Sequence, residues 1–342
     1  MKPSVSVLTA VRNGARYIGD MLSSIRSQTF EDWEHIIVDD ASSDETPDLL
    51  ARVARTEPRI RLIRRERSAG AAAALNHGLH EAAGRYVVLI DADDVAQPER
   101  ISLQRLFLEE HPELHACAGG WQEIDEGGAL IGDVRHPPSA TSRSLSWALP
   151  VVSGVVHSSL CIRRRVLVEL GGYRQQLSIA YDYGLWLDLA RSGWLGVMPE
   201  MTVRYRKHPG GISRDVEATR AECLRVLGPH MRALTGEPWG AEEIDALWSI
   251  GRWHPIDLGS GLDVLDRWER AWRVDPSLPA KDRGVLRRLG ARLRLRHIKW
   301  NRGSKRIAAA SGLARWVRIQ LEHPRARTAQ AAGEPPESAR AQ

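Results

Sequence analysis

The sequence lacks several features that mark common protein classes. Its three cysteines, Cys117, Cys161 and Cys223, are far apart and follow neither a metal-binding nor a disulfide spacing, which indicates a reducing cytosol. The N-terminus has no long apolar stretch of the kind found in signal peptides. No window approaches the ~20 apolar residues needed to cross a bilayer. We therefore expect a cytoplasmic protein without a membrane-spanning helix.

Two glycine motifs that bind phosphates are also missing. The glycine-containing stretch at residues 68–78 (SAGAAAALNHG) holds neither a GxxxxGK[ST] loop nor a GxGxxG sequence. P-loop NTPases and NAD-dependent enzymes are therefore not indicated. The chain also shows no internal repeat.

Charge is distributed unevenly along the 342 residues. The formal net charge is +5, yet residues 283–327 hold fourteen Lys or Arg and a single acid, which gives this segment +13. Residues 1–282 carry −7. An acidic body joined to a basic segment predicts an anionic surface as the partner of that segment.

The first part of the chain alternates strand and helix patterns. Strands are expected at residues 4–10, 35–39, 59–64 and 86–90, and helices at residues 15–28, 44–55, 69–83 and from Pro98 onward. Strands separated by helices of this length predict a mostly parallel α/β sheet with helices on both faces. Such sheets bind ligands at the carboxyl ends of their strands.

The pattern changes twice further along the chain. Residues 114–213 are less regular, with short strands expected at 115–119 and 202–206 and one clear helix at 183–192. From about residue 214 the sequence is helical and rich in tryptophan, with seven of the twelve Trp at or beyond Trp239. Residues 328–342 have the composition of a disordered tail.

Two acidic clusters directly follow expected strands. Asp39 and Asp40 could accept hydrogen bonds from a base or ribose, although a turn that caps the next helix needs similar residues. Asp91, Asp93 and Asp94 would repel one another unless a cation lies among them. The alternative is an acidic turn that is exposed to solvent. Mg²⁺ and Mn²⁺ prefer such oxygen ligands and complete their shell with substrate phosphates.

Three other polar residues have an ordinary and a functional interpretation. Asp182 begins an expected helix, where an Asp is usually an N-cap. His208 lies between an expected strand and a Gly-Gly turn, where a histidine is usually solvated. Asn76 lies in the 68–78 stretch and could be a packing residue of a helix entry.

Taken in order, these segments resemble glycosyltransferase family 2, the inverting enzymes of GT-A fold. The resemblance extends from Ser4 to about residue 213, roughly 60% of the chain. Seven segments match: 5–14 (VSVLTAVRNG), 37–44 (IVDDASSD), 70–78, 84–100 (GRYVVLIDADDVAQPER), 171–173 (GGY), 180–193 (AYDYGLWLDLARSG) and 204–213. The chain departs from the pattern at Tyr181, where the family commonly has Glu, and at Leu75, where Arg is frequent.

The resemblance implies a role for each matching residue. Asp182 takes the position of the general base, Asp93 ligates the divalent cation that bridges the diphosphate, and His208 completes the shell of that cation. Seven residues are expected to bind the nucleotide-sugar, with Thr9, Ala10 and Asp39 on the base and Asp91 on the ribose: Thr9, Ala10, Asp39, Asp40, Asn76, Asp91 and Ala92.

The function implied by the resemblance is transfer of a sugar from a nucleotide-sugar to an acceptor hydroxyl, in the synthesis of a cell-surface polysaccharide or another glycan. Residues 1–213 would form the catalytic domain and 214–327 a helical, basic region. Two alternatives remain open, a nucleotidyltransferase and a non-catalytic sugar- or membrane-binding relative. No nucleic-acid-binding module surrounds the basic segment.

The basic segment has two interpretations of its own. Leu313, Trp316, Val317 and Leu321 share one helix face, which is the form of an anchor lying on an anionic membrane. A lipid-linked acceptor would then be within reach of an enzyme peripheral to the inner membrane face. The other interpretation is a helical appendage that packs its apolar face on the protein and leaves its arginines solvated.

Overall fold

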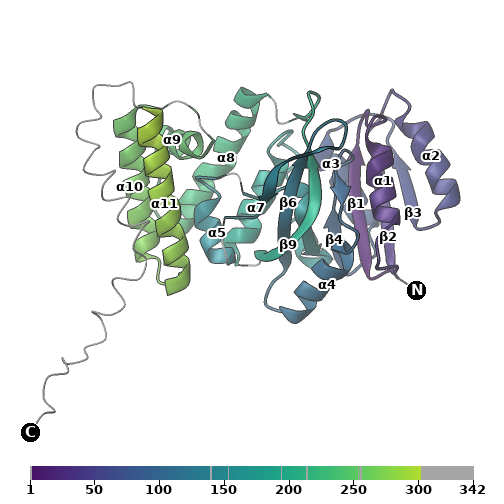
Figure 1. The fold of residues 1–342 in the computed structure, drawn as a ribbon, viewed down its shortest axis with the longest axis horizontal. Coiled ribbons are helices and arrows are strands. Elements are labelled where there is room, and N and C mark those ends of the chain that lie inside the picture. The colour runs from purple at the N-terminus through teal and green to yellow at the C-terminus, as the bar shows by residue number, and fades with distance from the viewer. Residues whose placement is uncertain are drawn as a thin grey trace, which may run out of the picture.

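The structure is a computed structural model that describes residues 2–301 apart from 139, 140, 153, 194, 213, 214, 253 and 255. A sheet with its covering helices forms one end of the molecule, and a group of helices forms the other end (Figure 1). The predicted anchor residues Leu313 to Leu321 and the predicted tail at 328–342 lie outside the described residues.

The described residues form a nine-stranded mixed sheet in the order β3-β2-β1-β4-β8-β6-β9-β5, with β7 paired to β6. The strands are β1 Val5–Val11, β2 Trp33–Asp39, β3 Ile60–Arg64, β4 Tyr86–Leu89, β5 Val95–Ala96, β6 Ala116–Ile124, β7 Leu130–Arg135, β8 Leu160–Arg163 and β9 Leu195–Arg206. The predicted parallel arrangement is confirmed for β3, β2, β1 and β4. Beyond β4 the sheet contains pairs of both kinds, since β8 runs antiparallel to both β4 and β6 and β9 runs parallel to β6.

Helices cover both faces of this sheet and form the far end of the molecule (Figure 1). They are α1 Ile18–Arg26, α2 Thr46–Thr56, α3 Ala71–Glu81, α4 Arg100–Glu110, α5 Ser142–Ala148, η1 His157–Ser159, α6 Arg164–Glu169, α7 Tyr181–Arg191, α8 Val216–Thr235, α9 Ala241–Arg252, α10 Leu258–Val274 and α11 Ala280–Trp300.

The sequence underestimates the length of two strands. β6 continues to Ile124 and β9 begins at Leu195, whereas short strands were predicted at 115–119 and 202–206. Gly119 and Gly120 in β6 and Pro199 in β9 weaken the local strand pattern. The two strands nevertheless pair in parallel along their length, with register shifts around Gly120 that absorb the irregularity.

Two hydrophobic clusters occupy the two faces of the sheet. Val88 and Ile90 face one cluster together with α1, while Val87 and Leu89 face the other. This second cluster continues without interruption into the C-terminal helices, where it includes Val226, Trp248, Trp268 and Leu293. The cluster includes residues on both sides of residue 213, so it does not mark the domain division predicted there, which stays a prediction.

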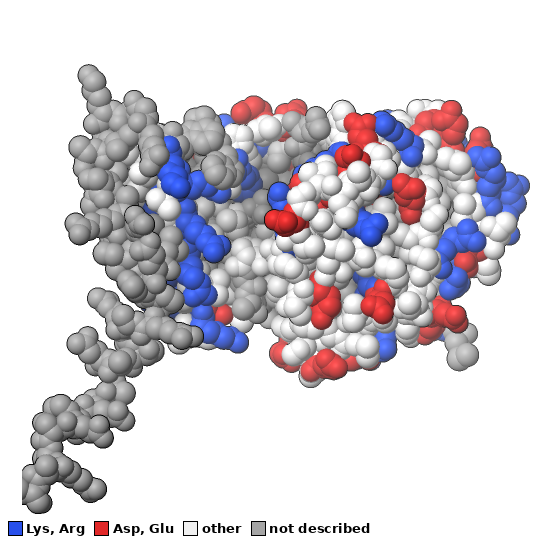
Figure 2. Space-filling view, in the orientation of Figure 1, with Lys and Arg blue, Asp and Glu red and all other residues white. Residues whose placement is uncertain are grey.

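Helix α11 presents opposite chemistry on its two sides. Leu286, Leu293 and Ile298 are buried, and the helix packs on α5, α9 and α10. Four exposed cations lie along its outer side at spacings of seven, four and seven residues, which places them on one helix face: Lys281, Arg288, Arg292 and Lys299. We call these four the basic stripe; a line of blue follows this end of the molecule in Figure 2.

The three cysteines are free and buried. Although Cys117 and Cys161 are far apart in the sequence, they are register partners on β6 and β8. Among the described helices, none combines the length and apolar character needed to cross a membrane.

Candidate active site

The parallel strands bring the predicted acidic residues to one edge of the sheet. β1 pairs with β2 as far as Val11 and Asp39, and with β4 as far as Leu8 and Leu89. The carboxyl ends of β2 and β4 therefore lie on either side of β1. Asp39 ends β2, and Asp91 follows β4 by two residues. This edge is the expected ligand-binding edge of such a sheet.

Asp39 has one carboxylate oxygen with an unused capacity to accept a hydrogen bond. The side chain is fully buried, and Oδ1 accepts from the Ser42 N–H at 3.0 Å. Within the described part of the chain, Oδ2 accepts no hydrogen bond, and the nearest cation is Arg64 Nε at 3.8 Å. A buried acceptor without a donor is costly, so a ligand N–H at this position would be favoured.

Thr9 faces the interior of the sheet. Its hydroxyl donates to the Ile90 carbonyl at 2.9 Å and lies 3.0 Å from His35 Nε2. Burial lowers the pKa of His35 to about 3, so this ring is neutral. The hydroxyl is thus already engaged, and a contact of Thr9 with a base would come from its main chain. Ala10, the next residue, is partly exposed.

Asp40 and Asn76 bind other parts of the chain. Asp40 accepts hydrogen bonds from Ser68 Oγ at 2.7 Å and from the main-chain N–H groups of Ala69 and Gly70, and Arg65 lies at 3.2 Å. The two polar atoms of the Asn76 amide bind the main chain of Tyr173, at 2.8 and 2.7 Å. Both residues thus fix loops at the site, while their predicted contacts with the nucleotide-sugar stay predictions.

The loop from Asp91 to Asp94 is fixed at its first residue. The Asp91 N–H donates to Ser158 Oγ at 2.9 Å, and its carboxylate lies 2.8 Å from His157 Nδ1. Burial would raise the pKa of Asp91, but His157 and Ser158 hold it below its ordinary value. Ala92 is partly exposed beside it. An ionised Asp91 at the rim of the site is suited to accept hydrogen bonds from ribose hydroxyls.

Asp93 and His208 come together as the resemblance implied. Asp93 Oδ2 lies 2.7 Å from His208 Nε2, and the ring of Tyr17 packs 4.8 Å from the His208 ring. Burial and the charge of Asp91 raise the pKa of Asp93, and His208 opposes that shift. A carboxylate oxygen and an imidazole nitrogen fit Mn²⁺. The described residues bring no group of three His, Cys, Asp or Glu together, so further ligands would come from donor phosphates.

Two buried arginines support the acidic loop, and sequence reasoning missed both. Arg206 donates from Nε to the Asp93 carbonyl at 2.8 Å and from its main-chain N–H to Asp94 Oδ1, also at 2.8 Å. Arg100 is fully buried and donates to the Leu89 carbonyl at 2.6 Å. Burial lowers the pKa of Arg100 to about 10. Each arginine stands within a matching segment, but only the fold shows that it lies beneath the carboxylates.

Asp182 lies in the first turn of α7 and is not the N-cap, which is Ala180. Its Oδ1 accepts from the Tyr183 N–H at 2.6 Å. Burial raises the pKa of Asp182 to about 6, against the opposing charge of His157. The other acid of this helix, Asp188, is held by Arg174 through both carboxylate oxygens, at 2.9 and 2.7 Å. Asp182 is therefore better suited to accept a proton.

His157 connects several of these groups and was not predicted. It is 3% exposed, and its Nε2 lies 2.9 Å from the Tyr173 hydroxyl. Since the Asp91 carboxylate only accepts, Nδ1 carries a proton, and in the neutral ring Nε2 accepts from Tyr173. Hydrogen bonds thus run from Asn76 through Tyr173 and His157 to Asp91. No local signal marks His157, because its partners are distant in the sequence.

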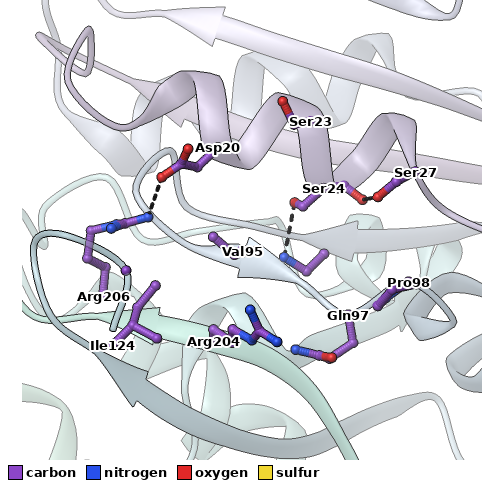
Figure 3. A pocket seen from close by; sticks show the side chains of 12 residues that line it. Asp20, Ser23, Ser24, Ser27, Val95, Gln97, Pro98, Ile124, Arg204 and Arg206 are labelled. Atoms are coloured by element: carbon purple, nitrogen blue, oxygen red, sulfur yellow. Dashed lines mark hydrogen bonds and ion pairs between the residues drawn. The ribbon is translucent and has the colours of Figure 1, made fainter. Parts of the chain in front are cut away.

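A cavity of about 510 Å³ lies beside the site, between α1, β5 and β9 (Figure 3). Ser23 of α1 and Ser27, which directly follows α1, line one side, and Gln97 and Arg204 line the other. Among the described residues that line it, none is a predicted site residue. The Arg206 side chain separates the two spaces, since it lines the cavity and also donates to the Asp93 carbonyl.

Comparison with known protein families matches the sheet region. The model of the family "Glycosyl transferase family 2" matches residues 6–171. TuaG of Bacillus subtilis, a putative teichuronic acid biosynthesis glycosyltransferase, is 31% identical over 218 residues, which are 62% of this chain and 82% of TuaG. An uncharacterized glycosyltransferase of Haemophilus influenzae is 30% identical, over 60% of this chain and 66% of its own length. The chain thus spans just under two thirds of this second relative.

Solved structures share the fold at low sequence identity. S. aureus TarS 1–349 in complex with UDP-GlcNAc has a TM-score of 0.57 and 17% identity, with 92% of each chain covered. The mannosyltransferase PcManGT from Pyrobaculum calidifontis, in complex with GDP-Man and Mn²⁺, has a TM-score of 0.51 and 20% identity, over 95% of this chain and 82% of that one. Together with the family match, these likenesses show that the chain belongs to glycosyltransferase family 2 and has the GT-A fold.

Proposed function

We propose that the chain transfers a sugar, with inversion, from a nucleoside-diphosphate sugar to an acceptor hydroxyl, and that Asp182 is the general base. One observation carries this proposal. A partly buried carboxylate, Asp182, whose pKa is raised to about 6, lies within electrostatic reach of Asp91 at the ligand-binding edge of the sheet. A base works best when its pKa is near the working pH, and the environment of Asp182 moves its pKa in that direction.

The reaction is a direct displacement at the anomeric carbon. Asp182 takes the proton of the acceptor hydroxyl as that oxygen bonds to the carbon, and the donor C–O bond breaks on the opposite face. The bond electrons leave with the nucleoside diphosphate, so an α-linked donor gives a β-linked product. Asp39 and Asp91 hold the nucleoside and thereby orient the donor for this attack.

Asp93 and His208 would hold the divalent cation, Mn²⁺ or Mg²⁺, together with the donor phosphates. That cation supplies Lewis acidity for the departing diphosphate when it is bound. Two observations support this role. Asp93 Oδ2 and His208 Nε2 lie 2.7 Å from each other, and the PcManGT structure contains Mn²⁺.

The donor and acceptor classes follow from the relatives. The TarS structure contains UDP-GlcNAc and the PcManGT structure contains GDP-Man, which supports a nucleoside-diphosphate hexose as the donor class. TuaG is named for teichuronic acid biosynthesis, which supports an acceptor among cell-surface glycans or their lipid-linked precursors. A thermal-shift screen of nucleotide-sugars with and without Mn²⁺ would identify the donor, since ligands that bind the native state stabilise it.

The basic stripe on α11 is our proposal for how the enzyme reaches such an acceptor. The stripe docks on an anionic membrane face by charge, since the apolar side of α11 is buried in the protein. For residues 280–300 this packing supports the packed-appendage interpretation over an inserted anchor. Each Lys or Arg near an anionic leaflet contributes about 1 kcal/mol, so four would give measurable, salt-sensitive binding.

Replacement of Asp182 by Asn tests the base. Asp182→Asn keeps the shape of the side chain but cannot take a proton, so kcat should fall by ~10²–10⁴ with donor affinity nearly intact. Asp188→Asn is the matched control on the same helix. Proton NMR of the product should show inversion, and wild-type kcat should rise with pH through about 6, because only the ionised base accepts a proton. An active Asp182→Asn variant beside an inactive Asp188→Asn variant would refute the assignment.

A further inference from the structure

Helix α7, which carries Asp182, begins without a capping side chain of its own. Its N-cap is Ala180, whose methyl group cannot accept a hydrogen bond. The helix nevertheless begins at Tyr181, two residues before the start predicted from the sequence. The main-chain N–H groups at the start of a helix need acceptors from elsewhere in the protein.

Glu222 of α8 binds the segment that leads into α7. Its Oε1 accepts from the Ser178 N–H at 3.0 Å, and its Oε2 accepts from the N–H groups of Ile179 at 2.8 Å and Ala180 at 2.9 Å. The side chain extends from α8 to the loop before α7 to make these contacts. Three successive N–H groups that converge on one carboxylate form an anion-binding nest of the kind found at functional turns.

The Glu222 carboxylate is held in its ionised form. Glu222 is 7% exposed, and burial alone would raise its pKa. The three main-chain donors and the charge of Arg225 instead hold the pKa below its ordinary value. A negative charge at the start of a helix also interacts favourably with the helix dipole.

We infer that Glu222 is a positioning residue for Asp182, so that the helical region after residue 213 completes the active site. By fixing residues 178–180, Glu222 sets the position at which α7 begins, and Asp182 is the second residue of that helix. This inference rests on the proposed role of Asp182 as the base. A base displaced by ~1 Å can lose about 10²-fold in rate, because the attack requires alignment.

The test is Glu222→Gln in the full chain. The amide keeps the size of the side chain, but only its oxygen accepts, and its NH₂ group faces main-chain N–H groups. We expect kcat to fall by about 10- to 100-fold while the donor KM changes less than about two-fold. The pH midpoint of kcat should also move down from about 6, because a less constrained Asp182 is better solvated. Glu217→Gln, on the same helix with an 80% exposed side chain, is the control and should match the wild type.

Two further measurements make the result decisive. If Glu222→Gln does not fold, the shorter carboxylate of Glu222→Asp, which cannot span all three N–H groups, must show the same loss of kcat at constant donor KM. Asp182→Asn is assayed alongside. If Asp182→Asn is inactive while the folded Glu222 variants keep wild-type kcat and pH midpoint, the inference about Glu222 is overturned and the proposed function stands. If Asp182→Asn is fully active, the proposed base is wrong and the inference falls with it.

Discussion

The sheet region, residues 5–206, and the helical region, residues 216–301, hold some of their buried acidic groups in opposite ways. In the sheet region, burial and neighbouring acids raise the pKa values of Asp93 and Asp94. In the helical region, burial would raise the pKa values of Glu243 and Asp275, but hydrogen bonds and nearby arginines lower both. The chain thus compensates the charges of Glu243 and Asp275, whereas it compensates those of Asp93 and Asp94 only in part.

Two buried arginines, one in each region, also differ in most of their partners. In the helical region Arg294 is 3% exposed and pairs with Asp266 and Glu269. In the sheet region Arg206 donates to three main-chain carbonyls, including that of Asp93, and pairs with one acid, Asp20, at 2.7 Å. Charged groups that are paired within the chain indicate a structural role, whereas an excess of negative charge at strand ends indicates a binding site. Three experiments can break or sharpen this comparison.

The largest effects should come from replacing one acid of each region. Replacement of Asp93 should abolish activity, whereas replacement of Asp275 should lower stability. Asp93→Ala should abolish turnover, as should EDTA on the wild type, because donor binding needs the cation. The fold should tolerate this change, since Asp93 makes one side-chain hydrogen bond, to His208. Asp275 accepts from Trp147 at 2.8 Å and from Arg143 at 3.1 Å. Asp275→Ala should therefore lower the free energy of unfolding by ~1–3 kcal/mol through unpaired buried donors.

Urea unfolding and a turnover assay, run on both variants, measure these outcomes. Full activity of the wild type in chelator would refute the metal requirement. A loss of stability in Asp93→Ala as large as that in Asp275→Ala would show that the acids of the two regions do not differ in kind.

A smaller effect is expected at His208. Removing one of two cation ligands should raise the metal concentration needed for half-maximal activity by about 10-fold or more, a typical cost of weakened metal coordination. His208→Ala is compared with His77→Ala, which changes an exposed histidine of α3. A Mn²⁺ titration of activity measures the shift. An unchanged titration would show that His208 is a loop residue without a role at the cation.

The smallest effect on chemistry should come from the basic stripe. Changing Lys281, Arg288, Arg292 and Lys299 to Glu should abolish sedimentation with anionic vesicles and leave turnover of a water-soluble acceptor unchanged. Changing exposed Arg52 and Arg55 of α2 to Glu is the control for charge reversal elsewhere on the surface. Binding of the wild type should weaken with salt. Equal recovery of the wild type on neutral and anionic vesicles would refute membrane docking by charge.

The sequence predicts the strands of the first part of the chain within about two residues, because a buried parallel strand and its helix leave strong apolar patterns. It also identifies Asp93, Asp182 and His208 as candidates, since they stand in segments that match the family. It cannot identify His157, Arg100 or Glu222. Each of these acts through partners at least eleven residues away, at distances that only the fold defines.

The same limit applies to residues whose predicted role differs from the role that the fold displays. Asp40 and Asn76 match the family's pattern, yet both bind the main chain of this protein. A motif records which residue stands at a position, but not which of its atoms remain free. The length of β9 also escapes prediction, because its pairing with β6 overrides the local weakness at Pro199.

The hydrophobic cluster shared by the two regions has a consequence for how the protein is made. It joins Leu8 of the first strand to Leu293 of the last described helix. As the chain leaves the ribosome, α3 can cover part of this face early, but the cluster is complete only after almost three hundred residues have emerged. The nascent sheet needs protection from aggregation during that interval. The native protein should unfold in a single thermal transition, in which the residues before and after residue 213 unfold together.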